Sequence, residues 1–427
     1  MPSSGVLAYS LIFGRQQRSW SILPGGSQTL VDALVRYLED HGSTVVTGKT
    51  VTRLILDGGR CVGVEAVSNG TGERHAYRAA RAVLSTIHVT HLRGMAPASS
   101  WPEEFHYSVD TYDVGIPGFG VYLATSAPPV FETQDNTERT AVSAVSAGIV
   151  GWPEDVINLG ADLRAGRFID SVPWLLVATP TLADPTRAPA GHHTVKLLSQ
   201  NVYDGPDWDA VKEEHARCQL ARLREAAPNF TPDVIEAMLV KSPKDYEKLN
   251  PHMVHGAFHG GDRGIAQSGA LRPAPGWGSH RMPIAGLYQT GATTHPGGSI
   301  TGAPGRNAAL VLLHDLGHDP AEILSPGRLL QGPGQVDGEH GGWRGPAGSC
   351  RARTASWWTF RHIRVCLNVH HLRGEEAEAA KTASFAALGI IVDSSVHPGV
   401  PNYPLSSCGG RRSGRGAPAA TAGEVHG

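Results

Sequence analysis

The sequence of 427 residues predicts an α/β fold of two lobes that is followed by an irregular C-terminal tail. Three observations support this prediction. Helical periodicity alternates with β-branched runs up to about residue 316, the pattern changes near Met95, and glycine and proline are frequent after Ser325. A chain of this length can form two or three domains with substantial cores, and its 41% of hydrophobic residues is ordinary for a globular protein.

The first unit opens with a helix that is expected from about Gln28 to His41, after the turn at Gly25 and Gly26. Gly42 stands where a glycine ends a helix in the left-handed conformation. Three β-branched runs follow, "TVVTG", "VTRLILD" and "CVGVEAV", and "HAYRAARAVLST" predicts a further strand that ends near Ser85. We therefore expect a helix, a small β-meander and a strand that joins a larger sheet.

From about residue 96 a mixed α/β lobe is expected. Its strands are "GFGVYLAT", "PWLLVATPTL", "HHTVKLLSQNVY" and "VIEAMLVKSP". The stretch "DWDAVKEEHARCQLARLREAAPNF" predicts a helix that Asp207 or Asp209 caps and Pro228 ends. Aromatic candidates for substrate contact in this lobe are Trp174, Tyr122 and Phe119.

The stretch "GLYQTGATTHPGGSITGAPGRNAALVLL", residues 286–313, carries the chemistry. It predicts a short buried strand, a glycine-rich turn, and a helix from Ala303 to Leu316. Glycine lets the main chain approach a flat ring, and a helix N-terminus stabilises negative charge. A flavin suits this arrangement because its reduced form is negative near the N1–C2=O edge. The alternative is an ordinary glycine-rich connection between a strand and a helix.

A longer stretch, from His259 to Ala309, resembles the C-terminal flavin-binding signature of phytoene-desaturase-like FAD-dependent oxidoreductases. The similarity is closest to the branch named pyridine nucleotide-disulfide oxidoreductase domain-containing protein. The elements that carry it are "LRP" (271–273), "PIAGLY" (283–288), "THPGG" (294–298) and "GRNAA" (305–309). The segments "PGGSQTLVDALVRYLEDHG" and "VTRLILDGGRCVGVEA" also resemble this family.

The resemblance implies FAD as the cofactor. Residues 291–292 would approach its pyrophosphate and ribityl chain, 296–299 would line the isoalloxazine ring, and 300–301 would offer main-chain groups at the pyrimidine end. The backbone of Val51 would meet the adenine, and Ser85 and Thr86 would border the same pocket. The implied cofactor residues are Val51, Ser85, Gly291, Ala292, Pro296, Gly297, Gly298, Ser299, Ile300 and Thr301. Ser299 stands where the family usually has a third glycine.

The fold that the resemblance implies is a two-lobe FAD/NAD(P)-binding flavoprotein fold, and we expect it to be incomplete. The family opens with a strand–GxGxxG–helix unit that holds the ADP half, and no GxGxxG occurs in this sequence. We therefore expect a truncated member. The expected divisions are a partial FAD-binding domain (1–95), a substrate lobe (96–256), the C-terminal FAD-binding signature (257–325) and the irregular tail (326–427).

Other features exclude several classes of protein. A net charge of −2 gives no footprint for nucleic acid, and no apolar run reaches the length of a membrane span, although contact with a membrane surface is compatible with the sequence. Five scattered cysteines without a CxxC pair predict a reducing, cytoplasmic setting and no structural zinc. The spacing of His252, His255 and His259 would suit a metal only on a helix, which Pro251 and Gly256 disfavour, so we expect no metal.

These observations together predict a dehydrogenase or desaturase that transfers hydride from a small hydrophobic organic substrate to FAD. No catalytic base stands out. His295 is a weak candidate for a proton acceptor, and ordering of the turn through its ring nitrogens is the favoured alternative. Two other functions remain open: a non-catalytic remnant that serves as a binding module, and an amine-oxidase-type flavoenzyme. The oligomeric state is not predicted.

Overall fold

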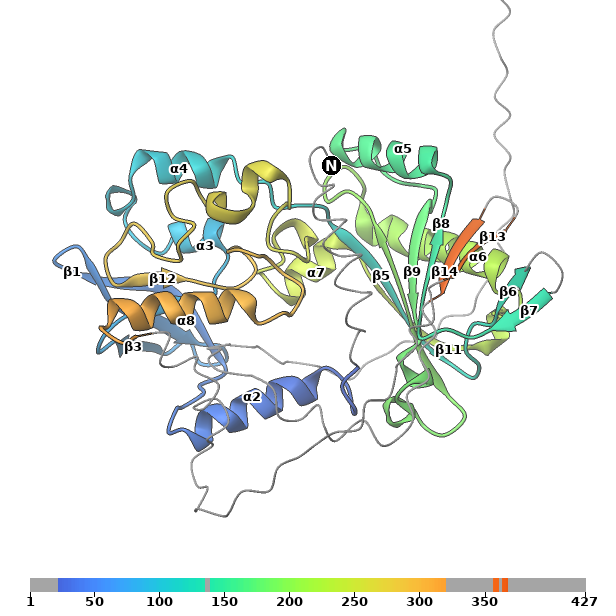
Figure 1. Cartoon of the computed structure of the whole chain (residues 1–427), viewed down its shortest axis with the longest axis horizontal. Coiled ribbons are helices and arrows are strands. Elements are labelled where there is room, and N and C mark those ends of the chain that lie inside the picture. The colour runs from blue at the N-terminus through green and yellow to red at the C-terminus, as the bar shows by residue number, and fades with distance from the viewer. Residues whose placement is uncertain (1–21, 135–138, 320–355, 361–362, 368–427) are drawn as a thin grey trace, which may run out of the picture. The chain divides into compact units, whose positions relative to one another are not determined.

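The computed structural model describes residues 22–134, 139–319, 356–360 and 363–367 of the chain (Figure 1). The first helix of the described residues, α2 (Gln28–Asp40), ends as predicted. Gly42 has φ 78°. Its N–H donates to Glu39 O (2.9 Å), and the N–H of Ser43 donates to Leu38 O (2.9 Å), which is the paired bonding that terminates a helix at a left-handed glycine.

A three-stranded antiparallel meander follows α2, in the order β1 (Lys49–Asp57), β2 (Arg60–Ser68), β3 (Arg74–Arg78). The prediction of a strand at "TVVTG", residues 44–48, is wrong. The third strand of the meander is β3 instead, with Tyr77 opposite Val64 in β2. The expected strand "HAYRAARAVLST" is correspondingly split between β3 and a separate strand, β4 (Val83–Ser85).

Strand β4 pairs in parallel with β12 (Leu287–Gln289), so segments about 200 residues apart in the sequence lie side by side. The core beneath this pair contains Leu54 and Cys61 of the meander, Val89 and Leu92 of a short helix, and Leu287. The helices here are α3 (Val89–Arg93) and α4 (Glu103–Asp110), neither of which the sequence reading identified, and α8 (Ala303–Asp315), which follows the glycine-rich loop as predicted. Figure 1 shows α8 beside β12.

The second sheet has seven strands in the order β11-β5-β10-β9-β8-β14-β13, and every neighbouring pair is antiparallel. Its predicted strands are present. The sequence reading missed β8, the hairpin β6–β7 and the helix α5. The elements of this part are β5 (Gly118–Thr125), β6 (Phe131–Gln134), β7 (Arg139–Val142), β8 (Ser146–Val150), α5 (Pro153–Arg164), β9 (Trp174–Ala178), β10 (His193–Gln200), α6 (Trp208–Ala226), β11 (Ile235–Lys241) and α7 (Pro243–Leu249).

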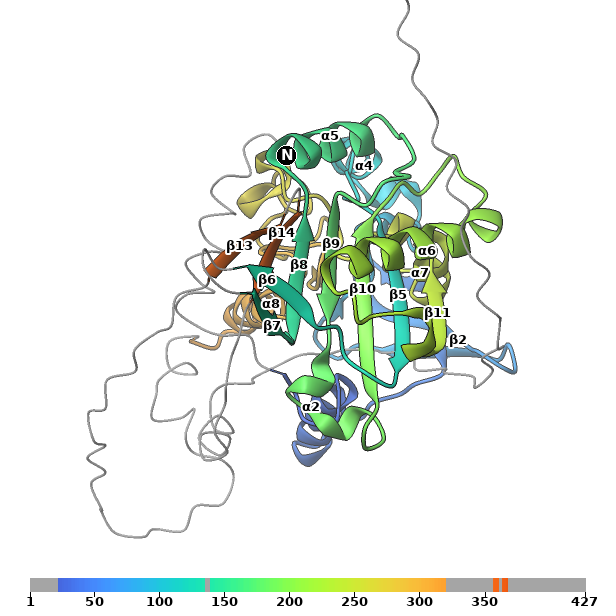
Figure 2. The same cartoon turned by 90° about the vertical axis from the view of Figure 1, so that its right-hand side faces the viewer.

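Helix α6 lies across the face formed by β10 and β5 (Figure 2). Asp207 caps it, since its side chain accepts from the N–H of Asp209. The buried face of α6 includes Leu220 and Leu223, which pack with Phe119 of β5. Phe119 is fully buried, so packing explains its aromatic character, and its ring lies 4.6 Å from that of His215.

The stretch predicted as an irregular tail contains two described strands, β13 (Ser356–Phe360) and β14 (Ile363–Leu367). They pair with each other, and β14 pairs with β8. The rest of that stretch lies outside the described residues. Of the helices within the described ranges, none has both the length and the apolar character needed to cross a membrane.

Candidate functional site

The glycine-rich loop leaves the end of β12 next to the end of β4. The N–H of Thr290 donates to Ser85 O at 2.8 Å, which continues the parallel pairing of Gln289 with Ser85. A side chain at Gly291 would lie 3.6 Å from Thr86 O. The structure therefore brings together Ser85, Thr86 and Gly291, which the resemblance had grouped around one pocket.

Two consecutive tight turns form the first half of the loop. The N–H of Thr294 donates to Gly291 O (3.1 Å), and the N–H of Gly297 donates to Thr294 O (2.7 Å). Thr293 and Thr294 are fully buried, whereas His295 and Pro296 are exposed at the outer side of the second turn. His295 is exposed at this turn. Its role as a proton acceptor stays a prediction.

The second half of the loop has an unusual backbone. Positive φ angles occur at Gly297 (96°), Ser299 (117°), Ile300 (54°) and Gly302 (69°). Glycine adopts such angles without strain, but a side chain makes them costly, above all a β-branched one. Ile300 is 90% exposed, so packing of its side chain does not compensate for this strain. Strained residues of this kind cluster at ligand-binding sites.

Replacing Ser299 by glycine is expected to stabilise the protein by roughly 1 kcal/mol. Relief of the positive φ angle, a strain of about 1–3 kcal/mol, exceeds the loss of one exposed hydrogen bond from Arg263 Nη2 to Ser299 Oγ (2.8 Å). Urea denaturation of the wild type and Ser299→Gly measures the difference. A variant less stable than the wild type would contradict this account of the loop.

Helix α8 begins directly after the loop, with Gly302 at its N-cap. The N-cap residue, Gly302, has no side chain to cap the helix, and Pro304 has no N–H. The N–H of Ala303 donates to Thr301 Oγ1 (3.3 Å). The positive end of a 13-residue helix dipole therefore meets the loop, as the sequence predicted.

Two arginines brace the loop from behind, and the sequence reading did not single them out. Arg272 is 1% exposed, and its guanidinium donates to Ala292 O (2.6 Å), Asp262 O (2.7 Å) and His259 O (3.0 Å). Arg263 Nη2 donates to the main-chain oxygen of Gly298. Arg272 is the arginine of the "LRP" element that carries the resemblance, and this motif was the one sign in the sequence that could have pointed to it.

Gly298 has a structural reason to lack a side chain. A Cβ at this position would lie 3.0 Å from the Cα of His259, so the close approach at Gly298 is between two stretches of this chain's own backbone. At Gly297 the position of a Cβ is 3.5 Å from the guanidinium carbon of Arg272. Contact of either glycine with a ring remains a prediction.

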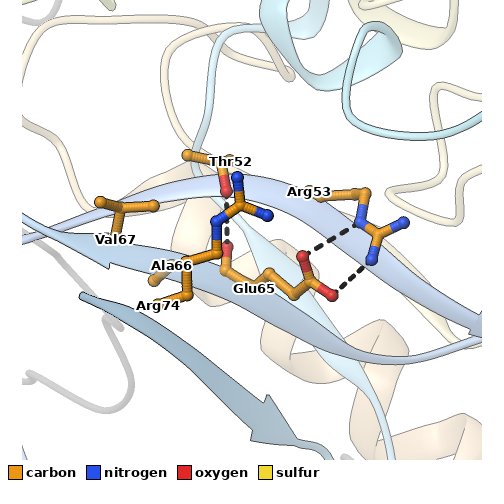
Figure 3. A pocket seen from close by; sticks show the side chains of 6 residues that line it. All are labelled: Thr52, Arg53, Glu65, Ala66, Val67 and Arg74. Atoms are coloured by element: carbon orange, nitrogen blue, oxygen red, sulfur yellow. Dashed lines mark hydrogen bonds and ion pairs between the residues drawn. The ribbon is translucent and has the colours of Figure 1, made fainter. Parts of the chain in front are cut away.

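Val51 lies apart from the loop. It pairs with Ala66, whereas the opposite end of the β1–β2 hairpin, at Cys61, donates to Ala285 just before β12. Six residues of strand, roughly 20 Å, separate Val51 from Asp57 at the end of β1. A surface cavity lies on the meander, where the Arg53–Glu65 ion pair (2.5 Å) joins β1 to β2 (Figure 3). The cavity is lined by Thr52, Arg53, Glu65, Ala66, Val67 and Arg74.

The histidine run at 252–259 does not form a helix face. His255 has φ 53° inside a single 3₁₀ turn, and its ring stacks on Tyr203 with centroids 4.6 Å apart. His252 instead packs edge-on against the buried His88, with centroids 5.3 Å apart. Within the described ranges, no three His, Cys, Asp or Glu side chains are arranged to hold a metal ion.

Comparison with known proteins identifies an FAD-binding family and several relatives of this chain. The family described as "FAD binding domain" matches residues 12–111. The rat pyridine nucleotide-disulfide oxidoreductase domain-containing protein 2 is 30% identical over 329 residues, which cover 74% of this chain and 55% of the rat protein. A limonene dehydrogenase polypeptide of Castellaniella defragrans is 26% identical over 341 residues (74% and 60%). The all-trans-zeta-carotene desaturase of Myxococcus xanthus is 27% identical over 301 residues (65% and 49%).

The fold and these matches define the class to which the chain is related, the FAD-binding α/β oxidoreductases. Within that class, the chain belongs to the phytoene-desaturase-like FAD-dependent oxidoreductases, which confirms the family and the cofactor that the sequence predicted. It spans about half the length of the curated relatives it matches.

The residues present fit a flavin at the loop. Two buried polar atoms directly before Gly291, Gln289 Oε1 and Thr290 Oγ1, have no hydrogen-bond partner among the described residues. The strained backbone at Ser299 and Ile300 and the helix end at Gly302 lie on the same loop. A polar, electron-rich ring could bond to the unpaired polar atoms, and its negative charge would be stabilised by the positive end of the helix. A strained backbone is also typical of a ligand-binding loop.

Proposed function

We propose that this chain provides the flavin-contacting part of an FAD-dependent dehydrogenase or desaturase that acts on a small hydrophobic substrate. The observation that carries the proposal is the loop from Gly291 to Gly302, with its strained backbone against the N-terminus of α8. The names of the limonene dehydrogenase and the carotene desaturase support an apolar substrate. Bound FAD would supply hydride acceptance at its N5 atom.

The residues of the loop would position the cofactor. We assign the pyrophosphate and ribityl chain to Gly291 and Ala292, the ring to residues 296–299, and its pyrimidine end to the main chain of Ile300 and Thr301. Ser85 would border the pocket, and Val51 would meet the adenine. The position of Val51 at the far end of the hairpin supports a role at the opposite end of a long ligand.

The division of the chain is also a proposal: 1–95 and 257–325 for the cofactor, 96–256 for the substrate, and 326–427 as the tail. One cluster of buried residues lies entirely between Phe119 and Val240, which supports a substrate lobe. Trp101, Phe105 and Tyr112 pack with the other cluster. We place the activity in the cytoplasm, with contact at a membrane surface as a route for an apolar substrate.

The visible spectrum of the purified chain tests the proposal. We expect flavin absorption bands that are released on denaturation, or that appear after added FAD is incorporated. A colourless protein that added FAD cannot reconstitute would contradict the proposal and favour a binding module without a redox role.

A further inference from the structure

Arg272 is a buried cation without a carboxylate partner. It is 1% exposed, and its guanidinium donates to four main-chain oxygens, those of His259, Asp262, Gln267 and Ala292. Within the part of the chain that the structure describes, its Nε atom has no hydrogen-bond partner. Among the ion pairs of the described residues, none involves Arg272 or Arg263.

The charge of Asp262 favours the protonated form of Arg272 and so acts to raise its pKa, but the two side chains form no ion pair. The carboxylate of Asp262 accepts from the N–H of Gly264 (2.6 Å), while its main-chain oxygen accepts from Arg272. Burial lowers the pKa of Arg272 and of Arg263, and Arg272 in turn helps to lower the pKa of His259. A buried charge of this kind is costly unless it is paired.

The charge is directed at the glycine-rich loop. The guanidinium carbon lies 3.5 Å from where a Cβ of Gly297 would be, and Arg263 reaches the same loop at Gly298 and Ser299. The positive end of the α8 dipole meets the loop from its other end, at Gly302. Three sources of positive potential therefore converge on one loop, and no carboxylate within the described residues pairs with either arginine.

We propose that Arg272, assisted by Arg263, is a positioning residue whose charge makes this loop favour the negatively charged form of a bound isoalloxazine ring. The inference rests on the proposed function. It assigns to the "LRP" arginine a task beyond bracing the loop: control of how readily the flavin accepts electrons.

Sulfite titration tests the charge without substrate or turnover. Sulfite donates an electron pair to flavin N5, an S–N bond forms, and the negative charge moves to the N1–C2=O edge. We expect Arg272→Gln to raise the Kd for sulfite about tenfold and to lower the two-electron midpoint potential by about 30 mV, the equivalent of that factor. Arg272→Lys, which keeps the charge, is expected to stay within roughly threefold of the wild type in sulfite affinity.

Thermal melting distinguishes the structural effect of each substitution from the effect of charge. Both variants lose hydrogen bonds from the guanidinium to main-chain oxygens, so both are expected to melt at a lower temperature than the wild type. Arg281→Gln removes a cation that is already paired with Asp315, and is expected to leave sulfite affinity unchanged. If Arg272→Gln does not fold, Arg263→Gln replaces it, with an expected loss of sulfite affinity of about threefold.

The outcomes are distinct. A coloured wild type with equal sulfite affinity in Arg272→Gln (or in Arg263→Gln as its replacement) would overturn this inference and leave the proposed function intact. Equal losses in Arg272→Lys and Arg272→Gln would show that bracing alone matters, which also overturns it. A wild type that binds no flavin overturns the proposed function and this inference together.

Discussion

Replacing Gly297 by valine is expected to abolish flavin binding. Gly297 has φ 96°, its N–H closes the turn to Thr294 at 2.7 Å, and a Cβ at this position would lie 3.5 Å from the guanidinium carbon of Arg272. A branched side chain would strain the turn by about 1–3 kcal/mol and would press against the Arg272 guanidinium that supports the loop, so the loop would lose the conformation proposed to hold the ring. The measurement is the ratio of flavin absorbance to protein after purification and after incubation with FAD.

Gly276 offers a matched control. It has a similar backbone angle, φ 88°, but nothing lies within 4 Å of where its Cβ would be. Gly276→Val should therefore carry a comparable backbone strain, seen as a lower melting temperature, and keep its flavin. A Gly297→Val protein that folds and retains full colour would refute the assignment of the ring to this loop.

The protein is expected to lose much of its stability between pH 6.5 and pH 4. Burial lowers the pKa of His88 to about 3 and that of His215 to about 4, and the neighbouring His252 and His91 also depress the former. Both side chains stay neutral in the folded state, whereas they bind protons in the unfolded chain below its ordinary pKa of 6.5. The free energy of unfolding therefore falls as the pH drops through this window.

The expected magnitude is large. Each histidine contributes a slope of about 1.4 kcal/mol per pH unit, so together they cost on the order of 6 kcal/mol at pH 4. That is comparable with the whole stability of a typical domain, about 5–15 kcal/mol. Carboxylates with lowered pKa values affect stability at a lower pH than these histidines. Hydrogen bonds from Thr186 and Arg187 lower the pKa of Asp184 to about 2, so its contribution is lost mainly below pH 3.8.

Urea denaturation at several pH values tests this expectation. His88→Gln and His215→Gln should each remove about one proton from the pH dependence between pH 4.5 and 6. Ile149→Val, which trims a fully buried side chain, should lower stability by a similar amount at every pH, about 0.5–1.5 kcal/mol. Curves of identical slope for the wild type and both histidine variants would refute the assignment.

The sequence was sufficient where one local pattern decides the structure. The apolar periodicity and terminal glycine of α2, the β-branched runs of β5, β9, β10 and β11, and the strand–glycine–helix order around β12 all depend on neighbouring residues. Those signals are local, so they were read correctly. The same holds for the family motifs of residues 259–309, which identify the class of cofactor.

Partner strands and short helices could not be read in this way. "TVVTG" has the composition of a strand, yet it forms none, and β3 is the strand that pairs with β2. Composition alone does not determine which segment becomes the partner of a strand. Helices α3 and α4 are too short to show helical periodicity, and their ends depend on packing of Phe105 and Leu92 in the core.

By itself, then, the sequence determined the class of fold, the cofactor and the loop that is proposed to bind it, because glycine spacing and helix patterns are encoded locally. Tertiary structure alone decided what surrounds the loop. It placed Arg272 behind Ala292, twenty residues away, and His88 beside His252, and it left Ser299 and Ile300 with positive φ angles. Burial and charge are properties of residues brought together from distant parts of the chain.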